Sequence, residues 1–259
     1  MPKIEKHADG SFCWMELATT DQAGAKQFYP TLFGWETSDF PMGPNEYYTM
    51  FKLGGGDAGA AYTMREEERK MAPPHWNLYI QVADADRAAK RAAELGGTVV
   101  AGPFDVMTFG RMAVILDPAG AAFCIWQPMQ NPGTTVTAEP GTVCWADLYT
   151  PNADRAKQFY EGLFGWSMEP GKNDPAYLHI KNGDEFIGGV PTVRPGEMQV
   201  PPSWNLYFHV TSCEASTAKA KELGAKVYEG PATIENVGRF SVVADPQGAV
   251  FSLFEPATR

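Results

Sequence analysis

Apolar residues alternate with polar ones in several short segments of the chain, a pattern typical of β-strands that bury one face. The clearest is 76–82, where every second residue is apolar and the residues between them are Asn77, Tyr79 and Gln81. The same pattern predicts further strands in the first half at 12–19, 47–53, 58–64, 98–101, 112–116 and 121–126. We therefore expect a sheet with one apolar face and one mixed polar and aromatic face.

Apolar residues recur at helical spacing in two other segments. Asp21 is predicted to cap a helix that ends at Gly34, and Asp84 to cap a helix that ends at Gly96. We expect the first strand to pack its apolar face under the first helix. The charged run 65–70 mixes both signs and is predicted to be a solvated loop. The order of these elements indicates two βαβββ units in the first half.

The second half of the chain repeats the first, which fixes the domain organisation. DQAGAKQFYPTLFGW (21–35) matches NADRAKQFYEGLFGW (152–166), and PPHWNLYIQV (73–82) matches PPSWNLYFHV (201–210). GRMAVILDPAGAAF (110–123) likewise matches GRFSVVADPQGAVF (238–251). We predict an α+β protein of two tandem domains, 1–130 and 142–259, joined by a linker at 131–141. Each domain is expected to be a pair of βαβββ units that form a curved mixed sheet around a cup.

These units, the DPAG and DPQG turns and the ELGG helix end resemble the vicinal oxygen chelate superfamily of glyoxalases, bleomycin resistance proteins and dioxygenases. The strings PPHWNLYI and GRMAVILDPAGAAF are most similar to tandem two-domain glyoxalase-like proteins, a group that includes a mycobacterial culture-filtrate antigen. The resemblance covers nearly the whole chain and recurs in both halves.

The polar and aromatic face of each predicted sheet is expected to line its cup, where such groups can meet a ligand. In the first half the expected ligand-binding residues are Trp14, Glu16, Asn77, Tyr79, Gln81, Cys124 and Trp126. In the second half they are Trp145, Asp147, Asn205, Tyr207, His209, Ser252 and Phe254. The aromatic residues either stack on a planar ligand or plug the cup. Glu255 and His209 replace Gln127 and Gln81, which predicts that the two cups differ in ligand chemistry.

The resemblance implies a divalent metal held by two histidines and a glutamate. Those positions fall on Trp14, Asn77 and Cys124 in the first half and on Trp145, Asn205 and Ser252 in the second. None of them is a histidine or a carboxylate, so we expect no metal and no cofactor. The alternative is a divalent transition metal bound by the atypical ligands Asp147 and His209.

The candidate catalytic residues are Glu16, Asp147 and His209, and the reaction, if there is one, is that of a glyoxalase-like lyase or dioxygenase. A carboxylate in the cup is either a general base or a structural hydrogen-bond partner. The other histidines, His7, His75 and His179, are expected at the surface. Arg111 and Arg239 are expected to contact Asp117 and Asp245.

The net charge of −10 disfavours nucleic acid as a partner, because phosphate binding needs clustered basic residues. No apolar run is long enough for a membrane span or a secretion signal, so we expect a cytoplasmic protein that does not associate with membranes. The four cysteines lack metal-site spacing and are expected to be reduced and mostly buried. A monomer or a homodimer is expected.

Together these features predict a protein that binds a small planar or hydrophobic molecule in a cup without the usual metal triad. The alternative is a metal-dependent lyase or dioxygenase that uses Asp147 and His209. A third possibility is a scaffold, which would be favoured if both cups were filled by their own side chains. The sequence leaves open the ligand and whether one or both cups function.

Overall fold

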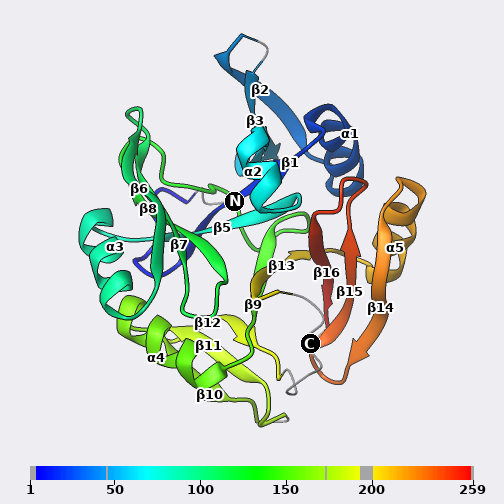
Figure 1. Cartoon of the computed structure of the whole chain (residues 1–259). Helices are drawn as coiled ribbons and strands as arrows, with labels where there is room; N and C mark the ends of the chain where they lie inside the picture. The colour runs from blue at the N-terminus through cyan, green and yellow to red at the C-terminus, as the bar shows by residue number, and fades with distance from the viewer. Residues whose placement is uncertain (1–3, 45, 173, 193–200, 258–259) are drawn as a thin grey trace.

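The chain folds into two eight-stranded mixed sheets, one in each half (Figure 1). The computed structural model describes residues 4–44, 46–172, 174–192 and 201–257. The strands of the first sheet are β1 (Phe12–Thr19), β2 (Glu36–Gly43), β3 (Glu46–Leu53), β4 (Gly56–Thr63), β5 (His75–Gln81), β6 (Thr98–Val106), β7 (Gly110–Leu116) and β8 (Ala122–Pro128). Those of the second sheet are β9 (Val143–Tyr149), β10 (Ser167–Pro170), β11 (Leu178–Asn182), β12 (Glu185–Val190), β13 (Ser203–His209), β14 (Lys226–Ile234), β15 (Gly238–Ala244) and β16 (Val250–Pro256).

The helices are α1 (Gln22–Phe33), α2 (Glu66–Met71) and α3 (Ala85–Glu94) in the first half, and α4 (Ala153–Phe164) and α5 (Cys213–Glu222) in the second. As expected, the side chain of Asp21 caps α1 by accepting the N–H of Gly24 at 2.9 Å. Gly34 ends the same helix with a left-handed φ of 73°, which glycine adopts without steric cost. No helix in the described residues is long and apolar enough to cross a membrane.

The strand order is the same in both sheets: β2-β3-β4-β1-β5-β8-β7-β6 in the first and β10-β11-β12-β9-β13-β16-β15-β14 in the second. Within each unit the first strand pairs in parallel with the last, as β1 does with β4 and β5 with β8. The two units of a sheet meet where β1 and β5 pair antiparallel. The predicted α+β fold of two tandem domains, each a pair of βαβββ units, is therefore confirmed.

Two elements differ from the sequence-based expectation. The charged run predicted to be a loop contains the short helix α2, whose first turn is capped because Glu68 accepts the backbone N–H of Arg65. Strand β2 was not predicted, because its residues are mostly exposed on both faces and lack the alternation that marks a half-buried strand.

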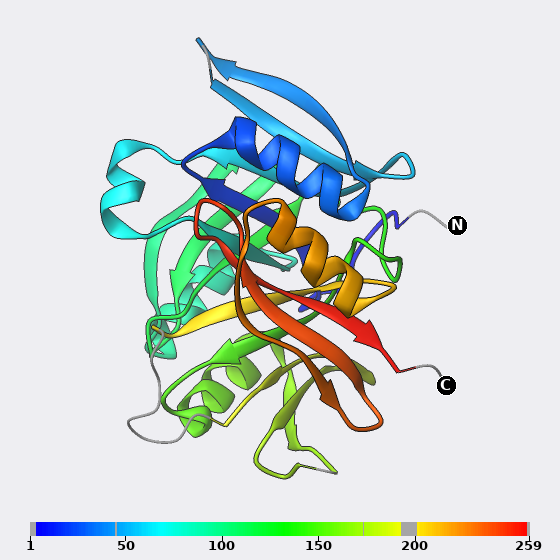
Figure 2. The same ribbon diagram turned by 90° about the vertical axis from the view of Figure 1, so that its right-hand side faces the viewer.

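The first helix of each domain packs on the sheet of the other domain rather than only on its own. On α1, Tyr29 lies 5.6 Å from Phe251 of β16 between ring centroids, and its hydroxyl donates to Asp245 at 2.8 Å. On α4, Tyr160 lies 5.6 Å from Phe123 of β8 and donates to Asp117 at 3.2 Å. Figure 2 shows α1 of the first domain beside α5 of the second. One continuous hydrophobic core therefore spans both domains.

Met15 and Leu17 of β1 belong to this shared core together with residues of α1. The expected contacts of two arginines, in contrast, are wrong. Arg111 does not contact Asp117 but pairs with Asp86 and Asp105, both at 2.8 Å. Arg239 pairs in the same way with Glu214 at 2.8 Å, which leaves Asp245 to the tyrosine of the other domain.

The segment between the domains, predicted as the linker 131–141, is bound to both sheets. Thr134 donates its N–H to the carbonyl of Cys13 at 2.7 Å, and Gly141 donates to the carbonyl of His209 at 2.8 Å. At Gly133 a Cβ would lie 2.1 Å from the same Cys13 carbonyl, so only glycine allows this close approach. Residues 133 and 134 therefore cover the start of β1.

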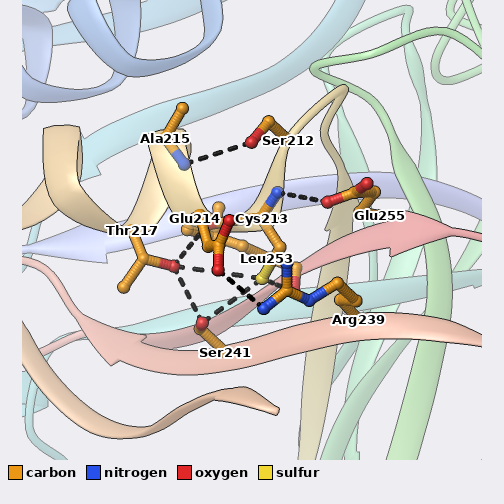
Figure 3. Close-up of polar contacts among 9 residues, drawn as sticks. All are labelled: Ser212, Cys213, Glu214, Ala215, Thr217, Arg239, Ser241, Leu253 and Glu255. Atoms are coloured by element: carbon orange, nitrogen blue, oxygen red, sulfur yellow. Dashed lines mark hydrogen bonds and ion pairs between the residues drawn. The ribbon is translucent and has the colours of Figure 1, made fainter. Parts of the chain in front are cut away.

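A buried polar network under α5 has no counterpart in the first domain (Figure 3). The hydroxyl of Thr217 lies 2.8 Å from that of Ser241, which lies 3.3 Å from the Cys213 thiol. The equivalent residues in the repeat are Ala85, Ala89 and Ala113. Glu255, in the same view, accepts the N–H of Cys213 at 2.8 Å, as Gln127 accepts that of Ala85 at 2.9 Å. The exchange of Gln127 for Glu255 therefore concerns helix capping and not the cup.

This network gives a stability prediction. We expect Ser241→Ala alone to lower the free energy of unfolding by about 1–2 kcal/mol, because the buried Thr217 hydroxyl loses a partner. The triple variant C213A/T217A/S241A, which reproduces the first domain, should cost less than the sum of the three single variants. Urea unfolding of the four variants measures this, and strictly additive costs would contradict it.

Candidate functional site

On the face that each sheet turns away from the shared core lies the same four-residue cluster: one carboxylate, two tyrosines and one tryptophan. In the first domain, cup 1 carries it as Trp14, Glu16, Tyr48 and Tyr79. In the second, cup 2 carries it as Trp145, Asp147, Tyr177 and Tyr207. Strand register explains the match, because Trp14 pairs with Tyr79 across β1 and β5, and Trp145 with Tyr207 across β9 and β13.

Cup 1 is filled by its own side chains. Tyr79 donates to Glu16 at 2.7 Å, and the indole of Trp14 donates to Tyr48 at 3.0 Å. Burial raises the pKa of Glu16, although hydrogen bonds from both tyrosines act in the opposite direction. Trp14, Tyr79, Cys124 and Trp126 are all buried and form a compact cluster with Cys13 and Ala60.

Two neighbouring segments cover this cluster. The indole of Trp126 donates to the carbonyl of Asn131 in the interdomain segment at 2.9 Å. Tyr62 at the end of β4 donates to Glu68 of α2 at 3.2 Å. The polar groups of Trp14, Glu16, Tyr48, Tyr79 and Trp126 are thus paired within the protein.

In cup 2 the carboxylate of Asp147 accepts three hydrogen bonds. Tyr177 and Trp145 donate to Oδ1 at 2.6 and 2.9 Å, and Tyr207 donates to Oδ2 at 2.8 Å. Burial raises the pKa of Asp147, and these hydrogen bonds partly oppose that effect. Trp145 and Tyr177 are half-buried, as is Phe254, whereas Trp126, the counterpart of Phe254, is buried.

Asn205 of cup 2 has an unpaired buried acceptor. Its Nδ2 donates to the hydroxyl of Ser252 at 2.7 Å, while its Oδ1 is buried and has no hydrogen-bond partner among the described residues. An unpaired buried polar atom costs about 1–3 kcal/mol, so such atoms are rare without a reason. The equivalent Asn77 of cup 1 differs, because its Oδ1 lies 3.2 Å from Nε2 of His75.

Two predicted cup residues are the register partners of Trp126 and Phe254 but make their hydrogen bonds outside the four-residue clusters. Gln81 is buried against the N-terminal segment, where its amide nitrogen donates to the carbonyl of His7 and lies 3.4 Å from Asp9, while its Oε1 has no partner among the described residues. His209 makes backbone hydrogen bonds to residues 141 and 142 and no side-chain hydrogen bond within the described chain. In the register of β13 and β9, Asp147 lies opposite Asn205, four residues before His209.

The histidine beside cup 2 is His179, which was expected at the surface. Its ring lies 6.0 Å from that of Trp145 and 5.1 Å from that of Tyr177, and its Nδ1 is buried without a partner. The surface prediction is also wrong for His7, which is buried and lies 2.8 Å from the carbonyl of Thr134. Sequence reasoning also missed Tyr48 and Tyr177, although the alternation in 47–53 could have indicated Tyr48.

The donor set of either cup does not fit a divalent transition metal. The positions of the usual ligands hold an indole, an amide and either the buried thiol of Cys124 or the hydroxyl of Ser252. Burial raises the pKa of Cys124, which keeps it a thiol rather than a thiolate ligand. The residues that the structure describes contain no group of three histidine, cysteine, aspartate or glutamate side chains that could hold an ion.

Two clefts lie at the junctions between the domains and not in the cups. One, of about 440 Å³, is bordered by Gln81, Arg87 and Leu163, and the other, of about 510 Å³, by Lys26 and Gln247. Neither contains the repeated cluster, and their walls combine exposed charges with the ends of helices. The placement of a ligand site in the cups stays a prediction.

Comparison with known proteins agrees with the fold and the repeat. Residues 11–125 match the glyoxalase/bleomycin resistance protein/dioxygenase superfamily, and residues 143–254 match the glyoxalase-like domain. The chain belongs to this superfamily, with one such domain in each half.

Relatives of the same two-domain length are known. The chain is 41% identical to "Putative glyoxylase CFP32" of Mycobacterium tuberculosis, over 99% of both chains. It is 33% identical to "Anthracycline biosynthesis protein DnrV" of Streptomyces peucetius, over 97% of this chain and 95% of the relative. A Mn(II)-bound glyoxalase from Novosphingobium aromaticivorans shares the fold, with a TM-score of 0.65 and 16% identity over 95% of this chain and 82% of that one.

Proposed function

We propose that this protein binds a small planar molecule without a metal, and that cup 2 is the binding site. The observation that carries this is the difference between two cups built on one plan. In cup 1 the carboxylate cluster has its polar groups paired and its aromatic residues are mostly buried, and the buried unpaired atom in the described part of that domain, Oε1 of Gln81, lies outside this cluster. Cup 2 retains half-buried aromatic residues and an acceptor, Oδ1 of Asn205, that has no partner among the described residues. On this proposal cup 1 has a structural role and binds no ligand.

The walls of cup 2 favour a flat, aromatic ligand. Trp145, Tyr177 and Phe254 each present a half-buried ring, and rings of this kind bind planar molecules by stacking and edge contacts. One relative supports the same class, because its name assigns it to the biosynthesis of anthracyclines, which are polycyclic aromatic compounds. Asp147 fixes the cup by holding Trp145, Tyr177 and Tyr207 together.

The test is a fluorescence-anisotropy titration of the intact chain with 2-hydroxyanthracene, in the presence of a chelator. We expect saturable binding of one molecule per chain. Trp145→Leu and His179→Ala should each weaken binding by at least about tenfold, or about 1.4 kcal/mol, because both remove part of the wall of cup 2.

The matched control is Met50→Ala, because Met50 occupies in β3 the register position that His179 occupies in β11. This variant should bind the probe within about twofold of the unchanged protein, a difference too small to reflect a lost contact. Equal weakening by Met50→Ala, binding of two molecules per chain, or no binding at all would each contradict the proposal.

A further inference from the structure

We infer that cup 2 selects ligands that donate a hydrogen bond, and that Oδ1 of Asn205 is the atom that recognises the donor. This inference rests on the proposed function of cup 2 and specifies its ligand class: a planar molecule that carries a hydroxyl or amino group. Asn205 is 6% exposed, its amide nitrogen donates to Ser252, and its Oδ1 has no partner in the part of the chain that the structure describes. A carbonyl oxygen can only accept a hydrogen bond, so the missing partner is a donor.

A single sequence difference between the repeats explains why this acceptor is free. In cup 1 the ring of His75 lies two residues before Asn77 on the same face of β5, with its Nε2 3.2 Å from the equivalent amide oxygen and its Nδ1 2.7 Å from the carbonyl of Pro73. Because a neutral imidazole carries one N–H, His75 donates to both oxygens only as an imidazolium. In cup 2 the residue two positions before Asn205 is Ser203, whose side chain is too short to take the place of the imidazole, so this contact is absent.

The electrostatics of cup 2 favour the same class of ligand. Asn205 and Asp147 are direct neighbours across β13 and β9, so an amide oxygen and a carboxylate lie side by side. All hydrogen bonds to Asp147 from the described residues come from tyrosine and tryptophan side chains, and none comes from lysine or arginine. Such a site favours ligands that donate hydrogen bonds and disfavours anions.

The experiment compares three probes that differ in one substituent: 2-hydroxyanthracene, 2-methoxyanthracene and anthracene-2-carboxylate. We expect the hydroxyl compound to bind at least about tenfold more tightly than the methyl ether, which has the same ring but no donor. The carboxylate should be the weakest ligand. Ser203→His, which restores the histidine of cup 1, should reduce the ratio between hydroxyl and methyl ether to about one in mildly acidic buffer, where the ring is an imidazolium and donates from both nitrogens.

Two control variants separate hydrogen bonding from bulk. Ser203→Phe introduces a ring of similar size without an N–H, so the preference for the hydroxyl compound should persist even if both affinities fall. His75→Ser changes cup 1 only and should leave all three affinities unchanged.

The outcomes distinguish this inference from the function on which it rests. Equal binding of hydroxyl compound and methyl ether, with both weakened by Trp145→Leu, would overturn donor selection and leave cup 2 as the binding site. Loss of the preference in Ser203→Phe as well as in Ser203→His would also overturn it, since bulk alone would then be the cause. If none of the three probes binds, both the inference and the proposed function are overturned.

Discussion

Phe208→Ala is expected to lower the free energy of unfolding by about 3–5 kcal/mol and to destabilise both domains together. Phe208 belongs to β13 of the second domain and is fully buried. Its ring lies 4.9 Å from Phe33, 5.9 Å from Trp35 and 5.3 Å from Trp76, all of the first domain. Removing the ring therefore opens a cavity at the centre of the shared core.

Calorimetry and urea unfolding monitored by tryptophan fluorescence measure this effect. Because the core is continuous, we expect a single transition for the unchanged protein and a single, shifted transition for the variant. Phe186→Ala is the control, since Phe186 is 56% exposed and should contribute less than about 0.5 kcal/mol. Two separate transitions, with only the one from the second domain shifted, would show that the domains fold independently.

The fold was largely predictable because its determinants are local and repeated. The strict alternation in β5 and the capping side chain of Asp21 each specify an element from a few neighbouring residues. The reciprocal exchange of α1 and α4 was not predictable in the same way. The sequence shows Tyr29 and Tyr160 at equivalent positions, but their partners Asp245 and Asp117 lie far along the chain in the opposite domain.

The candidate site was only partly predictable. The alternation of side chains along each strand placed Asp147 and Tyr207 on one face of the sheet, and their hydrogen bond agrees with that placement. The alternation did not identify Tyr177 and His179. The second lies on β11, which is separated from β9 in the sheet by β12, and this strand order could not be derived from alternation alone. The predicted pairing of His209 with Asp147 finds no support in the register, because Asp147 lies opposite Asn205, four residues before His209.

The duplication lets each cup serve as a reference for the other. The carboxylate with its two tyrosines and one tryptophan was retained in both, so it is a feature of the sheet and not by itself of a ligand site. Differences around this cluster carry the information about function. The loss of the His75 contact at Ser203 frees an acceptor, and glycine at position 189 instead of alanine makes room for the tyrosine of cup 2.

Gly189→Ala is therefore expected to weaken probe binding in cup 2 by at least about thirtyfold, or about 2 kcal/mol. A Cβ at this position would lie 1.8 Å from the hydroxyl oxygen of Tyr177 and 2.1 Å from its Cζ, so the ring must leave its place. Asp147 then loses its shortest hydrogen bond, of 2.6 Å, and the cup loses one wall. Because Tyr177 is half-buried and can turn towards solvent, the fold itself should persist.

The register-matched control is Ala60→Gly in cup 1, since Ala60 faces Glu16 as Gly189 faces Asp147. That variant should lose about 1 kcal/mol of stability and bind 2-hydroxyanthracene unchanged. If displacement of Tyr177 is the cause, Tyr177→Ala should weaken binding to the same extent, and the double variant Y177A/G189A should bind no more weakly than either single variant. Additive losses in the double variant would show that Gly189 acts on binding by a route other than Tyr177, and the packing argument for cup 2 would then be wrong.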